Sequence, residues 1–243
     1  MVMEYVWRAW ESYKKNWISF AVAELLRFLA VIIIILMGVG FILSSLGISS
    51  LLDLTSPELM SRTVSMLPLL TGVSTALIFF IIAGLAYVIL ETGMYGMATE
   101  SLRGKTRVET MFKVAKKKWL TGILTCVVVG IAAFLLLSVL VLSFGITFPI
   151  VGSIIGLIIF FLIMIFFVLI FPGIVIDNLG IIRTIEKSFN IVKKNYFEIF
   201  GLLLVYTIVF LVAFIPILGG LIILFVVLPM IRISLVFFYK RKK

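Results

Sequence analysis

Residues 150–176 read IVGSIIGLIIFFLIMIFFVLIFPGIVI and contain no charged side chain. A helix needs about 20 mostly apolar residues to cross the hydrocarbon core of a bilayer, and this stretch exceeds that length. A water-soluble fold would have no interior large enough for so much continuous apolar surface. The stretch therefore predicts a membrane-spanning helix.

Five further stretches have the same character. They are residues 17–43, 66–90, 119–143, 198–215 and 219–238. The whole chain of 243 residues is 63% hydrophobic and only 13% charged, with a mean hydropathy of +1.32. A typical soluble domain carries about 25% charged residues. We therefore predict an all-α polytopic membrane helical bundle with six transmembrane helices, forming a single membrane domain over residues 1–243.

The basic residues predict the orientation of these spans. Of 21 Lys and Arg residues, 18 lie in four segments, which are the N-terminus, residues 103–118, residues 183–194 and the tail 240–243. Six spans bring all four segments to one side of the membrane, and positively charged loops stay in the cytoplasm. We expect a multi-pass protein of the cell membrane with cytoplasmic N- and C-termini. The net charge of +10 then indicates contact with anionic lipid headgroups, and nucleic acid is not an expected partner.

One pattern recurs before the first, third and fifth spans. It consists of an aromatic residue, two lysines, a polar residue and a second aromatic residue, at residues 10–17, 112–119 and 189–196. Upstream apolar residues recur every three or four positions, which is typical of an amphipathic helix lying at the membrane interface. The interfacial anchors would be Lys14, Lys15, Trp17, Lys116, Lys117, Trp119, Lys193, Lys194 and Tyr196.

These recurrences predict three parallel repeats, each an interfacial amphipathic helix followed by a transmembrane hairpin. The repeats would span about residues 1–91, 105–177 and 178–243, related by an axis along the membrane normal. The alternative is that any cytoplasmic helix entering a membrane carries basic and aromatic residues.

Two loops carry a resemblance to a known group of proteins. Glu91, Gly93 and Gly96 follow the second span, and a series from Pro172 through Asp177 to Lys193 begins at the end of the fourth. This resembles a broad group of six-span prokaryotic membrane proteins that includes the membrane domain of some glycerophosphodiester phosphodiesterases. No soluble phosphodiesterase domain accompanies it here, so the resemblance implies a stand-alone membrane domain without that enzymatic activity.

The composition offers little catalytic chemistry. The chain has no His and one cysteine, Cys126, which lies within an apolar run. Zinc sites of the HExxH type and Ser-His-Asp triads are thereby excluded. We expect no enzyme activity and no cofactor. The absence of Gln and the low number of Asn residues also resemble the composition of thermophilic proteins.

Charged residues within or beside the spans are the candidate functional residues, because intramembrane charges usually face a bundle interior or a wet cavity. Glu24 and Arg27, three residues apart on the first span, could pair. The predicted polar cluster, in the inner-leaflet half, comprises Glu24, Arg27, Glu91, Asp177 and Arg232. Either these charges pair between helices, or they line a site for a ligand, a lipid headgroup or an ion.

Two functions follow from these alternatives. The first is a non-enzymatic membrane scaffold or accessory subunit, which would have a protein partner or assemble with further copies of itself. The second is a small transporter or lipid-handling protein with a polar cavity in the cytoplasmic half of the bundle.

Overall fold

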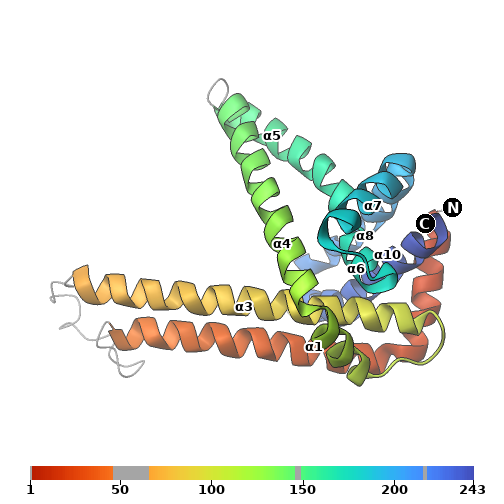
Figure 1. Ribbon diagram of the computed structural model, residues 1–243, viewed down its shortest axis with the longest axis horizontal. Coiled ribbons are helices and arrows are strands. Elements are labelled where there is room, and N and C mark those ends of the chain that lie inside the picture. The colour runs from red at the N-terminus through yellow and green to blue at the C-terminus, as the bar shows by residue number, and fades with distance from the viewer. Residues whose placement is uncertain (1, 46–65, 146–148, 216–217) are drawn as a thin grey trace. The chain divides into compact units, whose positions relative to one another are not determined.

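The computed structural model describes residues 2–45, 66–145, 149–215 and 218–243, and these residues are almost entirely helical, with no strand among them (Figure 1). The long helices are α1 (Val2–Ser45), α3 (Met66–Ser101) and α4 (Val108–Gly145). The next segments are α5 (Pro149–Met164), the short turn η2 (Ile165–Phe167), α6 (Ile170–Asp177) and α7 (Ile181–Lys194). The last are α8 (Tyr196–Val209), η3 (Phe210–Phe214), α9 (Leu218–Ile222), the π-helical segment η4 (Ile223–Val227) and α10 (Leu228–Lys242).

Five helices are long and apolar enough to cross a membrane. They are Val2–Ser44, Gly72–Ser101, Val108–Ser143, Ile154–Asp177 and Leu218–Lys242. In each of the first four, no more than 17% of the most apolar 18-residue stretch is buried inside the protein. Because apolar surface is unfavourable in water, lipid is the solvent that such helices require. The predicted span 198–215 corresponds to a shorter apolar helix, Tyr196–Phe210.

The chain forms two compact units. The smaller unit, Leu25–Tyr87, contains the C-terminal part of α1 and the N-terminal part of α3. Gly38 lies against Phe79 so closely that an added Cβ would come within 2.8 Å of the Phe79 Cβ, and the Phe41 and Phe79 rings stack at 5.2 Å. A glycine therefore permits the close approach of these two helices.

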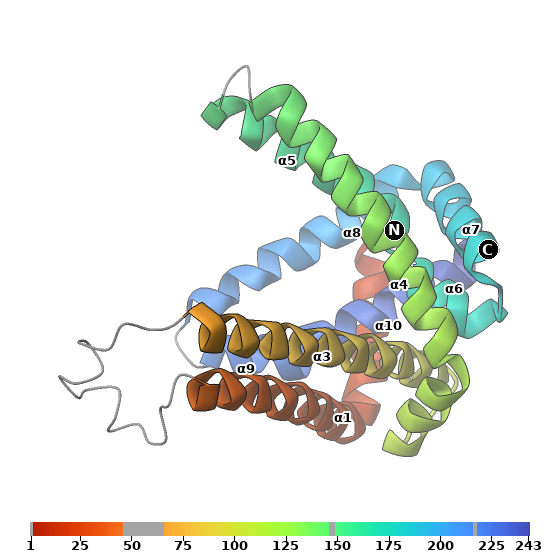
Figure 2. The ribbon, with the colours of Figure 1, turned by 60° about the vertical axis from the view of Figure 1, so that its left-hand side comes forward.

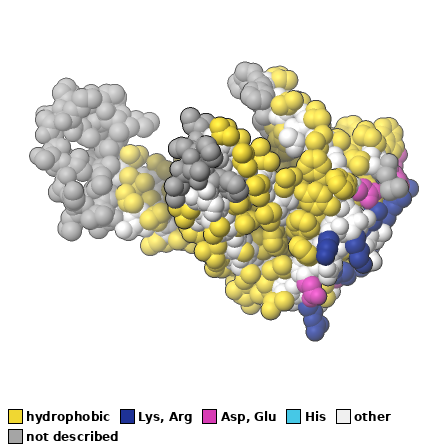
Figure 3. Space-filling model, turned by 90° about the horizontal axis from the view of Figure 1, so that it is seen from above, with side chains coloured by type: hydrophobic (Ala, Val, Ile, Leu, Met, Phe, Trp, Pro, Cys, Tyr) yellow, Lys and Arg dark blue, Asp and Glu magenta, His cyan; other side chains and the backbone are white. Residues whose placement is uncertain are grey.

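The larger unit, Met1–Glu24 with Val88–Lys243, holds most of the buried side chains. Within it, α4 and α5 lie side by side as a hairpin (Figures 1 and 2). A Cβ added at Gly156 would lie 3.5 Å from the Leu140 carbonyl oxygen. On the face seen in Figure 3, hydrophobic side chains predominate and charged side chains gather towards one end. This end is called the basic end below; it is built from the start of α1, the loop between α3 and α4, α7 and the C-terminus of α10.

The segments predicted to lie at the interface differ in form. The first two continue into the spans without interruption, as parts of α1 and α4, whereas the third is the separate helix α7. It ends because Asn195 leaves the helical conformation, with φ −129°. Its buried face contacts η2, where Ser188 donates to the Phe166 carbonyl at 2.8 Å and the Phe166 and Phe189 rings stack at 4.8 Å.

Candidate functional site

Three charged side chains from distant parts of the chain meet inside the larger unit. Arg232 of α10 donates from Nε to Glu91 Oε1 at 2.6 Å and from Nη2 to Glu91 Oε2 at 2.8 Å. Its third nitrogen, Nη1, donates to Glu24 Oε1 of α1. The guanidinium thus makes a two-pronged contact with one carboxylate of α3 and a further contact with a second carboxylate. We call these residues the triad.

The triad is shielded from the surroundings. Glu24 is fully buried, and Arg232 and Glu91 retain 3% and 8% of their exposure. Charges removed from water are tolerated when they are paired and hydrogen-bonded with good geometry, and the bidentate arginine–carboxylate contact is among the strongest of such pairs. The arrangement links α1, α3 and α10 in one electrostatic contact.

The backbone around Arg232 is unusual. Pro229 has no N–H to donate within the helix, and it is the second residue of α10, which follows the π-helical segment η4. The carbonyl of Phe225, four residues before the proline, accepts a hydrogen bond from the Tyr13 hydroxyl at 2.9 Å. A carbonyl that a proline leaves unpaired in a membrane helix needs such a partner. A tyrosine of α1 therefore contacts the π-helical segment that precedes Arg232.

A second tyrosine supports the same part of α10. The Tyr206 hydroxyl of α8 lies 2.6 Å from the Ser234 hydroxyl and 3.2 Å from the Met230 carbonyl. Ser234 also donates to the carbonyl of Tyr5. Sequence reasoning missed these tyrosines and Ser234. Pro229 was the one signal that could have led to Tyr13, because its lost N–H requires a substitute donor.

A close helix contact positions Glu91. Two residues further along α3, a Cβ added at Gly93 would overlap the backbone carbonyl of Met111 in α4. Thr92 is fully buried and donates to the Val88 carbonyl at 2.8 Å. Only glycine at position 93 lets α3 and α4 approach so closely next to the triad.

Four of the five residues of the predicted polar cluster belong to the larger unit, where they fall into two groups. Glu24, Glu91 and Arg232 form the triad. Asp177, at the end of α6, accepts hydrogen bonds from Lys187, Lys243 and Tyr239, the last two at 2.6 Å. Arg27 belongs to the smaller unit, where its guanidinium lies 4.8 Å from the centre of the Tyr87 ring.

The basic end carries further ion pairs that join the two ends of the chain to the rest. Glu4 pairs with Arg241 at 2.6 Å, and Glu198 pairs with Lys242 at 2.6 Å. Tyr5 donates to Glu198 at 3.2 Å. The lysines among the predicted anchors are exposed, and Trp17 and Trp119 keep about half of their surface uncovered, at 54% and 48%.

The larger unit contains several cavities. The two at the basic end have volumes of about 570 and 410 Å³, and two apolar ones lie beside α4 and α8. None of these four is lined by a member of the predicted polar cluster. Within the described part of the chain, no group of three or more acidic or cysteine side chains could hold a metal ion.

The all-helical fold and its five long apolar helices define the class, which is compatible with a multi-pass membrane protein. A family model described as a domain of unknown function (DUF7847) matches residues 35–239, and the chain belongs to this family. No curated protein and no solved structure matches the chain. The family match shows no link to glycerophosphodiester phosphodiesterases, so that resemblance stays a prediction.

Proposed function

We propose that this protein is a non-enzymatic scaffold or accessory subunit of the cell membrane. The observation that carries this proposal is the triad, whose charges are buried and bonded to one another and line none of the four cavities described above. Intramembrane charges in such an arrangement hold helices together. In a transporter they would face a water-filled path.

The proposed topology has six spans and cytoplasmic termini, and contacts among the four basic segments support it. The side chain of Asn16 donates to the Gly104 carbonyl and accepts from the Thr106 N–H, joining the N-terminal segment to the first basic loop. Asp177, at the end of α6, pairs with Lys243 at 2.6 Å and also with Lys187, which joins the tail to the segment 183–194. Four positively charged segments at one end of the larger unit are what the positive-inside rule requires of one membrane face.

Corresponding hydrogen bonds support the proposed repeats. The aromatic–lysine patterns of the second and third repeats are offset by 77 residues, and this offset relates Glu100 to Asp177 and Thr110 to Lys187. Thr110 donates to Glu100 at 2.6 Å, and Lys187 donates to Asp177. In both repeats an acidic residue at the end of a hairpin thus receives a hydrogen bond from the helix that opens the next unit.

A cysteine-accessibility experiment separates the scaffold from the transporter. In a Cys126→Ser background, Thr92→Cys introduces a thiol beside Glu91 at a fully buried position, and Lys105→Cys provides an exposed control. A scaffold with a dry triad predicts that a small charged methanethiosulfonate reagent, added to unsealed membranes so that it reaches both faces, modifies the control within minutes and leaves Thr92→Cys unmodified. Modification of both positions at similar rates would overturn the proposal in favour of a hydrated transport path.

A further inference from the structure

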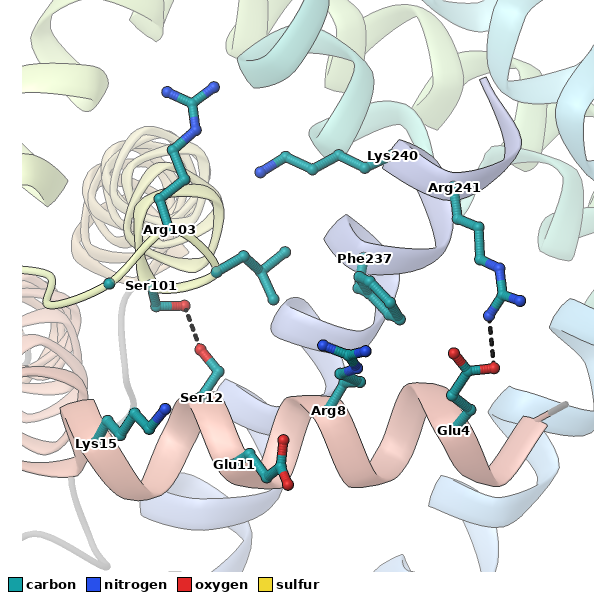
Figure 4. Close-up of a pocket in the computed structure, with 12 residues that line it drawn as sticks. Glu4, Arg8, Glu11, Ser12, Lys15, Ser101, Arg103, Phe237, Lys240 and Arg241 are labelled. Carbon is teal, nitrogen blue, oxygen red and sulfur yellow. Dashed lines mark hydrogen bonds and ion pairs between the residues drawn. The ribbon is translucent and has the colours of Figure 1, made fainter.

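The largest cavity described above lies at the basic end, apart from the triad. It has a volume of about 570 Å³, within the range of small-molecule sites, and opens between the N-terminal part of α1, the loop that follows α3 and the last turns of α10 (Figure 4). Segments from the beginning, the middle and the end of the chain therefore form one concave surface.

The charge of this cavity is strongly positive. Five cationic side chains line it, namely Arg8, Lys15, Arg103, Lys240 and Arg241. Two carboxylates, Glu4 and Glu11, line it as well, which leaves an excess of three positive charges. A concave surface lined by charges of one sign concentrates counter-ions of the opposite sign.

The two carboxylates do not neutralise the remaining cations. Glu4 is bonded to Arg241 at 2.6 Å, and Glu11 accepts a hydrogen bond from the Trp7 indole at 2.9 Å. Among the described residues, Arg8, Lys15 and Arg103 form no ion pair or hydrogen bond with a carboxylate. Their hydrogen-bond donors remain available to a ligand.

Several of these side chains are held in place without a ligand. The Arg8 guanidinium lies 5.9 Å from the centre of the Phe237 ring, as a cation–π contact, and Lys240 donates to the Thr99 carbonyl at 3.1 Å. Beneath them the Ser12 hydroxyl donates to the Ser101 hydroxyl at 3.0 Å, which joins α1 to the end of α3 (Figure 4). Side chains ordered in advance lose less conformational entropy when a ligand binds.

We propose that this cavity binds a phosphate group, carried either by the headgroup of an anionic phospholipid or by a soluble phosphate ester. The planar guanidinium of an arginine can donate two parallel hydrogen bonds to phosphate oxygens, and the ammonium group of a lysine adds a positive charge. Phe237 and Leu102 supply an apolar wall for the glycerol or acyl part of a lipid. This binding site goes beyond the proposed scaffold role and does not depend on it, because it lies outside the triad.

The test measures binding to the purified full-length chain in an uncharged detergent. The probes are short-chain phosphatidic acid, glycerol phosphate, which carries the same phosphate group without acyl chains, and short-chain phosphatidylcholine as the zwitterionic control. The cavity variant is Arg8→Gln/Lys240→Gln. Its matched control, Arg107→Gln/Lys113→Gln, removes one arginine and one lysine from exposed positions that do not line the cavity.

We expect the cavity variant to weaken binding of phosphatidic acid at least tenfold, since hydrogen bonds to charged groups are lost, and the control to weaken it less than twofold. If glycerol phosphate binds as tightly as phosphatidic acid, the ligand is a soluble phosphate ester. If glycerol phosphate binds clearly more weakly than phosphatidic acid, the ligand is a lipid. Equal weakening by both variants, equal binding of phosphatidylcholine or an absence of saturable binding overturns the proposal. If Arg8→Gln/Lys240→Gln aggregates or melts early, Arg8→Gln/Arg103→Gln, which keeps the bond from Lys240 to Thr99, replaces it.

Discussion

Arg232 is the residue on which the triad depends, because its guanidinium contacts both carboxylates. Arg232→Met leaves Glu24 and Glu91 buried without that partner, and breaking a buried ion pair in this way costs about 3–5 kcal/mol. The triple variant Arg232→Met/Glu24→Gln/Glu91→Gln removes all three charges and should recover most of this loss. Thermal unfolding in detergent, followed by tryptophan fluorescence, measures both. A triple variant as unstable as the single one would contradict the assigned role.

The sequence predicted how deep in the membrane each charged residue would lie, but not towards which helix its side chain would point. The spacing of Glu24 and Arg27 pointed to a pair on one helix, whereas Glu24 also contacts Arg232, which lies 208 positions along the chain. Whether charges on separate helices meet depends on the rotation of each helix about its axis, and packing sets that rotation. Asp177 was predicted for the same cluster because we expected it at a similar membrane depth, yet it contacts Lys187 and Tyr239.

At the scale of helices, α3 and α4 form a contact that tolerates no side chain at position 93. Gly93→Ala forces its new Cβ against the Met111 carbonyl, so the two helices must separate. Overpacking of this kind typically costs about 1–3 kcal/mol. Gly84→Ala, in the same helix, has open space around the new Cβ and should be neutral or stabilising by up to about 1 kcal/mol.

Comparing the melting temperatures of Gly93→Ala and Gly84→Ala in the same detergent tests this difference. Equal melting temperatures would mean that α3 and α4 do not approach each other as closely as described. The long apolar runs predicted both helices, since length and hydropathy alone define a span. The contact itself could not be predicted, because Gly84 and Gly93 look alike in the sequence and differ only in what lies beside them.

At the scale of the whole molecule, the four basic segments form one end of the larger unit although they are separated by long apolar helices. The six predicted spans would bring these segments to one side, because each hairpin returns the chain to the side on which it began. The sequence could not predict the individual ion pairs, such as the pair of Glu4 with Arg241 between the two ends of the chain. Those pairs depend on side chains meeting across helices.

The orientation in the membrane gives the last prediction. In a Cys126→Ser background, Asn190→Cys lies at an exposed position of α7, and Ser56→Cys lies between the first two predicted spans, outside the described residues. A membrane-impermeant maleimide added to intact cells should label Ser56→Cys alone, and it should label Asn190→Cys only after the membrane is opened. Ser188 would be a poor substitute for Asn190, because it is fully buried against Phe166 and would resist labelling on either side. Labelling of Asn190→Cys in intact cells, with Ser56→Cys protected, would reverse the proposed topology and turn the phosphate-binding cavity to the outer face.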